Sequence, residues 1–146
     1  MDIVWYNRSI GTPMVTVAAT GLTFNQAAVI ALNNPDFIWL GYARDKQWIV
    51  VQPVQENKPE VFPFASRKRD KHVRVQSRDF IRFLSVQDDD FDLGRTVRVP
   101  SYWDTDLSLL IVDLSKAEMD GEDEDMSGEV AEPRGMEKGY TTYIPQ

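Results

Sequence analysis

Short β-branched and apolar segments, separated by polar turns, recur along the first half of the chain. Residues 14–17 and 21–24 have the alternating or β-branched character of strands. Residues 37–42 and 48–53 are longer apolar segments, and the polar residues 44–46 between them predict a hairpin. The pattern predicts a β-rich first half.

Two short helices are predicted, each beginning at a polar N-cap. Asn25 can cap a helix over 26–33, which an Asn-Asn-Pro sequence ends. Ser77 can cap a second helix over 78–85, and Asp79 in its first turn favours the helix dipole. Each helix has about two turns.

The second helix belongs to a second series of elements. Residues 72–75 and 95–99 alternate as strands do, residues 100–105 predict a turn, and residues 107–114 form a mostly apolar strand. Each half of the chain therefore contains a strand, a capped helix and a hairpin, in that order.

The two series share their apolar spacing. Counted from the cap, apolar residues stand at positions three, four and seven, which lie on one helical face. They are Ala28, Val29 and Leu32 in the first helix and Phe80, Ile81 and Leu84 in the second. We interpret this as one βαββ unit used twice, over about 14–54 and 72–114. Coincidence is the alternative, because short capped helices before hairpins are common. The predicted fold class is α+β and β-rich, a small pseudo-symmetric barrel or sandwich of two βαββ units with two short helices and a disordered C-terminal tail.

Two resemblances bear on this unit. Phe24-Asn25 stands where AbrB-like swapped-hairpin regulators have Ile-Pro, Leu32 matches a Leu near the end of the helix, and Pro53 ends the hairpin. Neither unit here carries that Ile-Pro proline, and the family's usual protomer has one unit and dimerises. This resemblance implies a DNA-binding transcription regulator. The run 21–53 is also similar to short uncharacterised proteins of bacteria, phages and mobile elements, which implies an accessory role.

The composition predicts one folded domain that has no disulfide cross-links. The 146 residues include 42% hydrophobic and 11% aromatic residues, enough apolar material for a core. Without cysteine, disulfides, thiolate metal sites and cysteine nucleophiles are excluded. The first eight residues lack the pattern of a signal peptide, and no apolar stretch approaches the ~20 residues that span a bilayer. We expect a cytoplasmic protein, in the host cytoplasm if a phage encodes it.

The net charge of −7 is unevenly distributed. Residues 116–146 hold nine acidic and three basic residues, so this segment carries −6 and residues 1–115 carry −1. Residues 116–134 have no apolar periodicity and cannot bury enough surface to offset their ordering entropy. We predict a single β-rich domain over 1–115 and an acidic disordered tail over 116–146.

A basic cluster precedes the second helix. Five cations fall within eight residues and are opposed by Asp70; they are Arg67, Lys68, Arg69, Lys71 and Arg74. Arg78 and Arg82, four residues apart on the helix, can extend this surface. Such a cluster can bind nucleic acid or an acidic partner. The alternatives are a solvated linker between the two units and a patch onto which the acidic tail folds back.

Tyr102 and Trp103 fall in the predicted turn beside Asp104. An exposed aromatic pair at this position would be a protein-binding hot spot or a platform for base stacking. The alternative is that both rings belong to the core or to cross-strand pairs, as most aromatic residues on alternating strands do.

The sequence carries no recognisable catalytic motif. There is no Gly-rich phosphate loop and no Gly-flanked nucleophilic serine, and the single histidine, His72, lies among cations. The acidic run 88–94 fails the EF-hand template, because positions six and twelve hold Leu93 and Val99. We therefore expect no enzyme, no catalytic residue, no cofactor and no metal.

The predicted function is a non-catalytic binding or regulatory accessory protein, encoded by a phage or mobile element and acting through protein–protein contacts. The first alternative is an AbrB-like DNA-binding regulator. The second is an acidic DNA mimic that inhibits a nucleic-acid enzyme. We expect a protein partner, with nucleic acid as the alternative, and no membrane partner.

Overall fold

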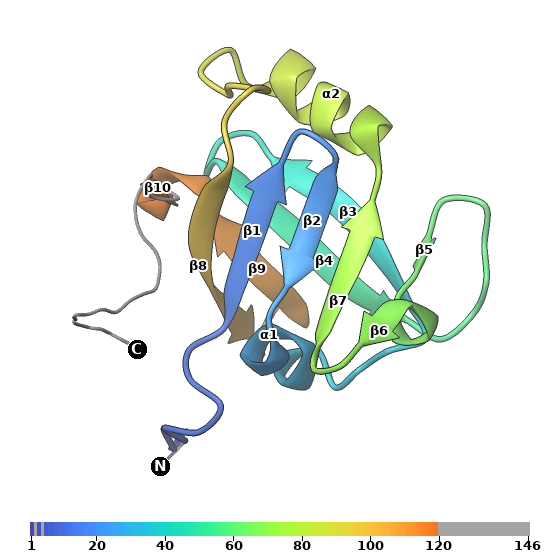
Figure 1. Cartoon of the computed structure of the whole chain (residues 1–146), viewed down its shortest axis with the longest axis vertical. Helices are drawn as coiled ribbons and strands as arrows, with labels where there is room; N and C mark the ends of the chain where they lie inside the picture. Colours follow the sequence, from blue (N-terminus) through green and yellow to red (C-terminus); the bar gives the residue numbers. More distant parts are fainter. Residues whose placement is uncertain (2, 4, 120–146) are drawn as a thin grey trace.

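In the computed structural model, which describes residues 1, 3 and 5–119, antiparallel strands form one sheet that curls into a half-barrel (Figure 1). The strands are β1 (Met14–Ala18), β2 (Gly21–Phe24), β3 (Phe37–Ala43), β4 (Trp48–Val54), β5 (Phe62–Pro63), β6 (Lys68–Arg69), β7 (His72–Gln76), β8 (Val97–Asp104), β9 (Leu109–Asp113) and β10 (Glu118–Met119). Nine of them follow the order β5-β3-β4-β9-β8-β1-β2-β7-β6, and β10 pairs with β8 outside this path. The β-rich class and the hairpin of β3 and β4 are confirmed.

The two predicted helices and both caps are confirmed. They are α1 (Gln26–Ala31) and α2 (Arg78–Gln87), which lie at opposite ends of the half-barrel (Figure 1). The Asn25 side chain accepts from the Ala28 amide at 2.9 Å, and the Ser77 hydroxyl accepts from the Phe80 amide at 3.1 Å. The six apolar positions predicted from the spacing are all buried. The series strand, helix, hairpin occurs twice, as β2-α1-β3-β4 and as β7-α2-β8-β9.

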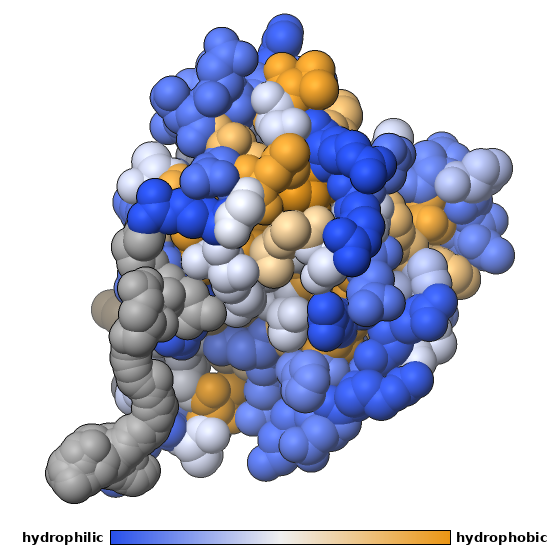
Figure 2. Space-filling model, turned by 45° about the horizontal axis from the view of Figure 1, so that its top comes forward, coloured by the Kyte–Doolittle hydropathy of each residue, from blue (hydrophilic) through white to orange (hydrophobic). Residues whose placement is uncertain are grey.

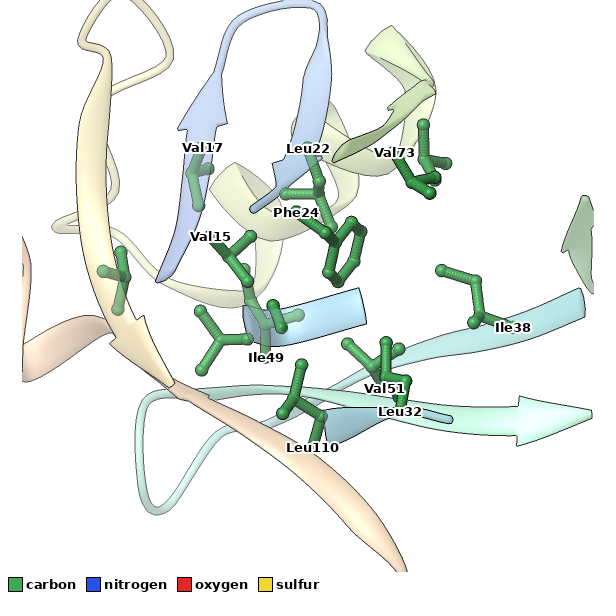
Figure 3. Packing of buried hydrophobic residues seen from close by; sticks show 14 of the residues in the cluster. Val15, Val17, Leu22, Phe24, Leu32, Ile38, Ile49, Val51, Val73 and Leu110 are labelled. Atoms are coloured by element: carbon green, nitrogen blue, oxygen red, sulfur yellow. The ribbon is translucent and has the colours of Figure 1, made fainter. Parts of the chain in front are cut away.

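The core fills the space between the strands and the two helices (Figure 3). Alternating inward residues such as Val15, Val17 and Ile49 are fully buried, as the period of two in a strand requires. Phe24 meets Phe64 edge to face, with ring centroids 5.1 Å apart. Phe64 precedes the basic cluster and is fully buried, whereas residues 67–71 of the cluster are exposed.

The predicted turn over 100–105 is wrong. These residues, except Thr105, belong to β8, which pairs with β1 as far as Pro100 and with β9 from Ser101 onward. Proline has no N–H to give to a ladder, and it is tolerated here because β8 changes partner at this point. The turn lies at Thr105–Ser108 instead, where Ser108 has a φ of 56°.

The ends of the sheet path do not pair with each other. β5 pairs only with β3, and β6 pairs only with β7, so the curled sheet stays open between them in the part of the chain that the structure describes. The short helix η1 (Ala65–Arg67) joins these two end strands. We call the opening between β5 and β6 the seam.

The first residues of the predicted tail join the sheet. The helical turn η2 (Leu114–Lys116) leads into β10, whose Glu118 and Met119 stand opposite Arg98 and Val97 of β8. The rest of the predicted disordered tail, residues 120–146, lies outside the described residues. Over the described chain, no helix is long and apolar enough to cross a membrane.

Candidate functional site

An open pocket of about 430 Å³ lies at the seam. Its lining comes from both ends of the sheet path and from η1; the residues are Phe62, Pro63, Arg67, Arg69, Arg74, Val75 and Gln76. We call it the seam pocket. It combines three guanidinium groups with an apolar wall.

Local structure positions each arginine. Arg67 ends η1, and Arg69 stands opposite His72 in the β6–β7 hairpin. This hairpin closes through a two-residue turn in which Asp70 has a φ of 60°, a conformation that Asp tolerates better than most residues. Arg74 follows two residues after His72 on β7, opposite Thr23 of β2. The basic cluster thereby folds around one opening instead of running along an extended linker.

Among the described residues, Arg69 and Arg74 donate to neutral acceptors. Arg69 Nη1 donates to the Lys68 carbonyl at 2.9 Å, and Arg74 Nη2 donates to Thr20 Oγ1 at 3.1 Å. Within the described residues, no carboxylate pairs with the three arginines. Each guanidinium offers five N–H donors. Most N–H donors of Arg67, Arg69 and Arg74 therefore remain available to an anion.

The structure brings together three of the seven basic residues predicted for this surface. Lys68 and Lys71 are exposed beside the pocket, while Arg78 and Arg82 are exposed on α2 and do not line it. Sequence reasoning missed the apolar wall. The sequence feature that could have indicated this wall is the Phe62-Pro63 pair, which begins five residues before Arg67, the first cation of the cluster.

One edge of β7 is open at the pocket. β6 covers only His72 and Val73, so the stretch 74–76 has a strand neighbour on the β2 side alone among the described strands. An exposed strand edge is a template for pairing with a further extended chain. The seam pocket therefore offers arginine donors, an apolar wall and a strand edge together.

The predicted aromatic pair is divided between two faces of the sheet. Trp103 packs against the core, whereas Tyr102 is 44% exposed on the outer face. Successive residues of a strand point to opposite faces, so a pair in a strand cannot form one platform. Trp39 of β3 is 49% exposed and lies on the outer face shared with Tyr102, with β4 and β9 between β3 and β8. Burial, and then the charges of Asp104 and Asp113, raise the pKa of the Tyr102 phenol.

A second, acidic pocket of about 240 Å³ lies beside the loop after α2. The Tyr42 hydroxyl donates to Asp88 Oδ2 at 2.8 Å, which ties this loop to β3. Burial, and then this hydrogen bond, raise the pKa of Tyr42 well above its ordinary value. Over residues 1, 3 and 5–119, no group of three or more His, Asp or Glu side chains is arranged to hold a metal ion. We interpret this region as a structural tie.

Comparisons with protein-family models, with curated proteins and with solved structures found no match to this chain.

Proposed function

We propose that this protein is a non-catalytic binding protein that holds an extended, acidic segment of a protein partner in the seam pocket. The observation that carries the proposal is the set of three arginines that face one opening without a carboxylate partner in the described chain. Carboxylates of a bound segment would accept charge-assisted hydrogen bonds there.

The other properties of the pocket favour a polypeptide as the ligand. Phe62, Pro63 and Val75 supply apolar surface, and the open edge of β7 supplies backbone groups. A peptide strand can use both, because its backbone pairs with the edge while alternate side chains meet the wall. A nucleic-acid backbone would use only the cations.

Titration calorimetry with a synthetic peptide of alternating Glu and Val residues tests this function. We expect binding at 50 mM salt that weakens at 300 mM, because partly exposed ion pairs are screened. Reversing all three pocket arginines (R67E/R69E/R74E) should weaken binding by about tenfold or more, since each lost charge-assisted bond contributes about 1 kcal/mol.

The matched control reverses three cations outside the pocket, R44E/R78E/R82E, and changes the net charge equally. It should leave the affinity within about threefold of the wild type, the size of a long-range charge effect. Equal losses in both variants would exclude the seam pocket as the binding site.

A DNA-binding regulator is the second candidate, and the strand pairing favours it. The first strands of the two series, β2 and β7, pair with each other, and so do the last strands, β4 and β9. Both pairs are antiparallel. This is the arrangement that two βαββ units related by a twofold axis would have. We infer that the halves derive from one duplicated unit, as the resemblance to AbrB-like regulators implies.

A gel shift with duplex DNA distinguishes the candidates. A regulator of this class would bind duplex at low salt, with affinity that falls steeply as salt rises. Duplex binding that R67E/R69E/R74E abolishes, together with no binding of the acidic peptide, would reverse our order of preference.

A further inference from the structure

We propose that the acidic run of this same chain, Glu122, Asp123, Glu124 and Asp125, with the acids that follow it, occupies the seam pocket and competes with the partner. This inference rests on the proposed function and adds a regulator of the same site.

The chain reaches the tail from a fixed point on the sheet. β10 pairs with β8, so Glu118 and Met119 are anchored at Arg98 and Val97. The acidic run begins only three residues later in the sequence. Its point of attachment therefore lies beside β8, in the sheet that continues through β1 and β2 to β7.

A polar row on this face leads from β10 to the pocket. Directly opposite residues in successive pairings share one face of a sheet. They connect Glu118, Arg98, Thr16, Thr23 and Arg74. Thr16 and Thr23 are half-buried, whereas Arg98 and Arg74 are exposed. The short threonine side chains therefore lie between two longer cationic side chains that extend further into solvent. In Figure 2, hydrophobic and weakly polar side chains occupy the middle of the face in view, and strongly hydrophilic ones lie at its sides.

The distances match the spacing of the acids. Four strand spacings of about 4.8 Å separate β10 from β7, or about 19 Å. Extended chain covers at most about 3.3–3.6 Å per residue, so positions three to six residues after Met119 reach about 10 to 21 Å. The chain length therefore allows Glu122 to reach the row, Asp125 to reach Arg74 and Glu129 to reach the pocket.

Charge complementarity and tethering favour this contact. Residues 120–137 hold eight acidic residues and one basic residue. The three pocket arginines and Arg98 lie at the two ends of the row. Covalent attachment through a short segment gives an effective concentration of about 1 mM or more, so contacts too weak for free peptides become populated. Screening should release the tail as the salt concentration rises.

Paramagnetic NMR on the full chain tests the contact directly. Because the protein has no cysteine, M126C gives one site for a nitroxide label directly after the acidic run. At 50 mM salt we expect the label to broaden the amide signals of residues 67–76, with recovery at 500 mM. The matched control carries the same label in E122Q/D123N/E124Q/D125N, which should not show the broadening. Equal broadening in both proteins, or none in either, would overturn the proposal.

A mixing experiment identifies the source of the tail. Nitroxide-labelled protein that lacks ¹⁵N is mixed with ¹⁵N-enriched protein that lacks the nitroxide. Only contacts between molecules can then broaden the observed signals. Broadening as strong as in the single-molecule experiment would mean that a second copy supplies the tail, and would overturn the intramolecular proposal.

Competition with the Glu-Val peptide tests the regulatory consequence. E122Q/D123N/E124Q/D125N should bind the peptide about three- to tenfold more tightly than the wild type, because the tethered competitor is gone. The matched control D45N/E56Q/E60Q/D106N neutralises four exposed acids outside the tail and should change the affinity by less than twofold.

The outcomes separate the two proposals. Equal peptide affinities in wild type and tail variant would refute the tail as competitor while the proposed function stands. Failure of the peptide to bind even the tail variant would refute the proposed function, and the NMR result would then decide the tail contact alone.

Discussion

Gly21 is the residue whose backbone depends most on the absence of a side chain. Its φ is +147°, and a Cβ built on it would collide with the carbonyl oxygen of Val75 on the neighbouring strand β7. Both features exclude L side chains at this position unless the β2–β7 pair separates.

Gly21→Ala should therefore lower the free energy of unfolding by about 3 kcal/mol or more, as strained positions that also clash do. Gly94→Ala is the matched control, because its Cβ would meet only Asp92 Oδ1 at an ordinary 3.5 Å. The control should stay within about 0.5 kcal/mol in urea unfolding. Similar losses for both variants would contradict the role assigned to Gly21.

Tyr42 gives stability a dependence on alkaline pH. Burial and the hydrogen bond to Asp88 keep its phenol protonated in the fold above its ordinary pKa of 10.0. Below that pH both states hold the proton, so the stabilisation is complete. As pH rises past 10, the unfolded chain loses the proton while the fold retains it, and the free energy of unfolding falls.

Tyr42→Phe should remove this contribution. Between pH 10 and 11.5, the free energy of unfolding of the wild type should fall by up to about 1.4 kcal/mol more per pH unit than that of the variant. Urea unfolding at pH 8, 10 and 11 measures the difference, and exposed Tyr6→Phe serves as control. Parallel pH profiles for wild type and Tyr42→Phe would show that the phenol does not titrate as described.

At the scale of elements, helix α1 is held to strand β1 by one side chain. Asn25 Oδ1 accepts from the amides of Ala28 and Met14 at 2.9 and 3.0 Å, and its Nδ2 donates to the Thr12 carbonyl at 2.9 Å. The residue is thus an N-cap and a clamp between a helix and the start of a strand.

Asn25→Ala should cost about 2–3 kcal/mol of stability, more than a cap alone, because three hydrogen bonds are lost. Asn25→Asp retains the acceptor and loses only the donor, so it should recover more than half of the loss. Thermal and urea unfolding of both variants provide the measurement. A cost for Asn25→Ala below 1 kcal/mol would mean that Asn25 is only a surface polar residue.

The sequence predicted these elements where local chemistry decides structure. Both helices have caps with short-range partners, and β3 and β4 are long enough to show their pattern. The two-residue strands β5 and β6 have no periodicity and exist because the tertiary fold places them. The turn at 100–105 was mispredicted because Pro100 looks like a breaker, and only the change of partner within β8 explains its place in a strand.

At the scale of the whole molecule, the candidate site was predicted only in part. The cations were visible as a cluster, but the sequence could not show that three of them surround an opening with an apolar wall. That arrangement arises because β5, η1, β6 and β7 fold so that residues 62–76 surround the gap between the two ends of the curled sheet. Likewise, the separation of Tyr102 from Trp103 follows from strand geometry that a predicted turn concealed.

The sharing of β8 between β1 and β9 has a thermodynamic consequence for folding. Loss of β8 would remove a ladder partner from β1, at the start of the unit over 14–54, and from β9, at the end of the unit over 72–114. We expect tryptophan fluorescence and far-ultraviolet circular dichroism to report a single coincident urea transition. Amides of β8 should exchange with deuterium only through global opening, far more slowly than those of β5 and β6. Two resolved transitions would show instead that the halves melt as independent units.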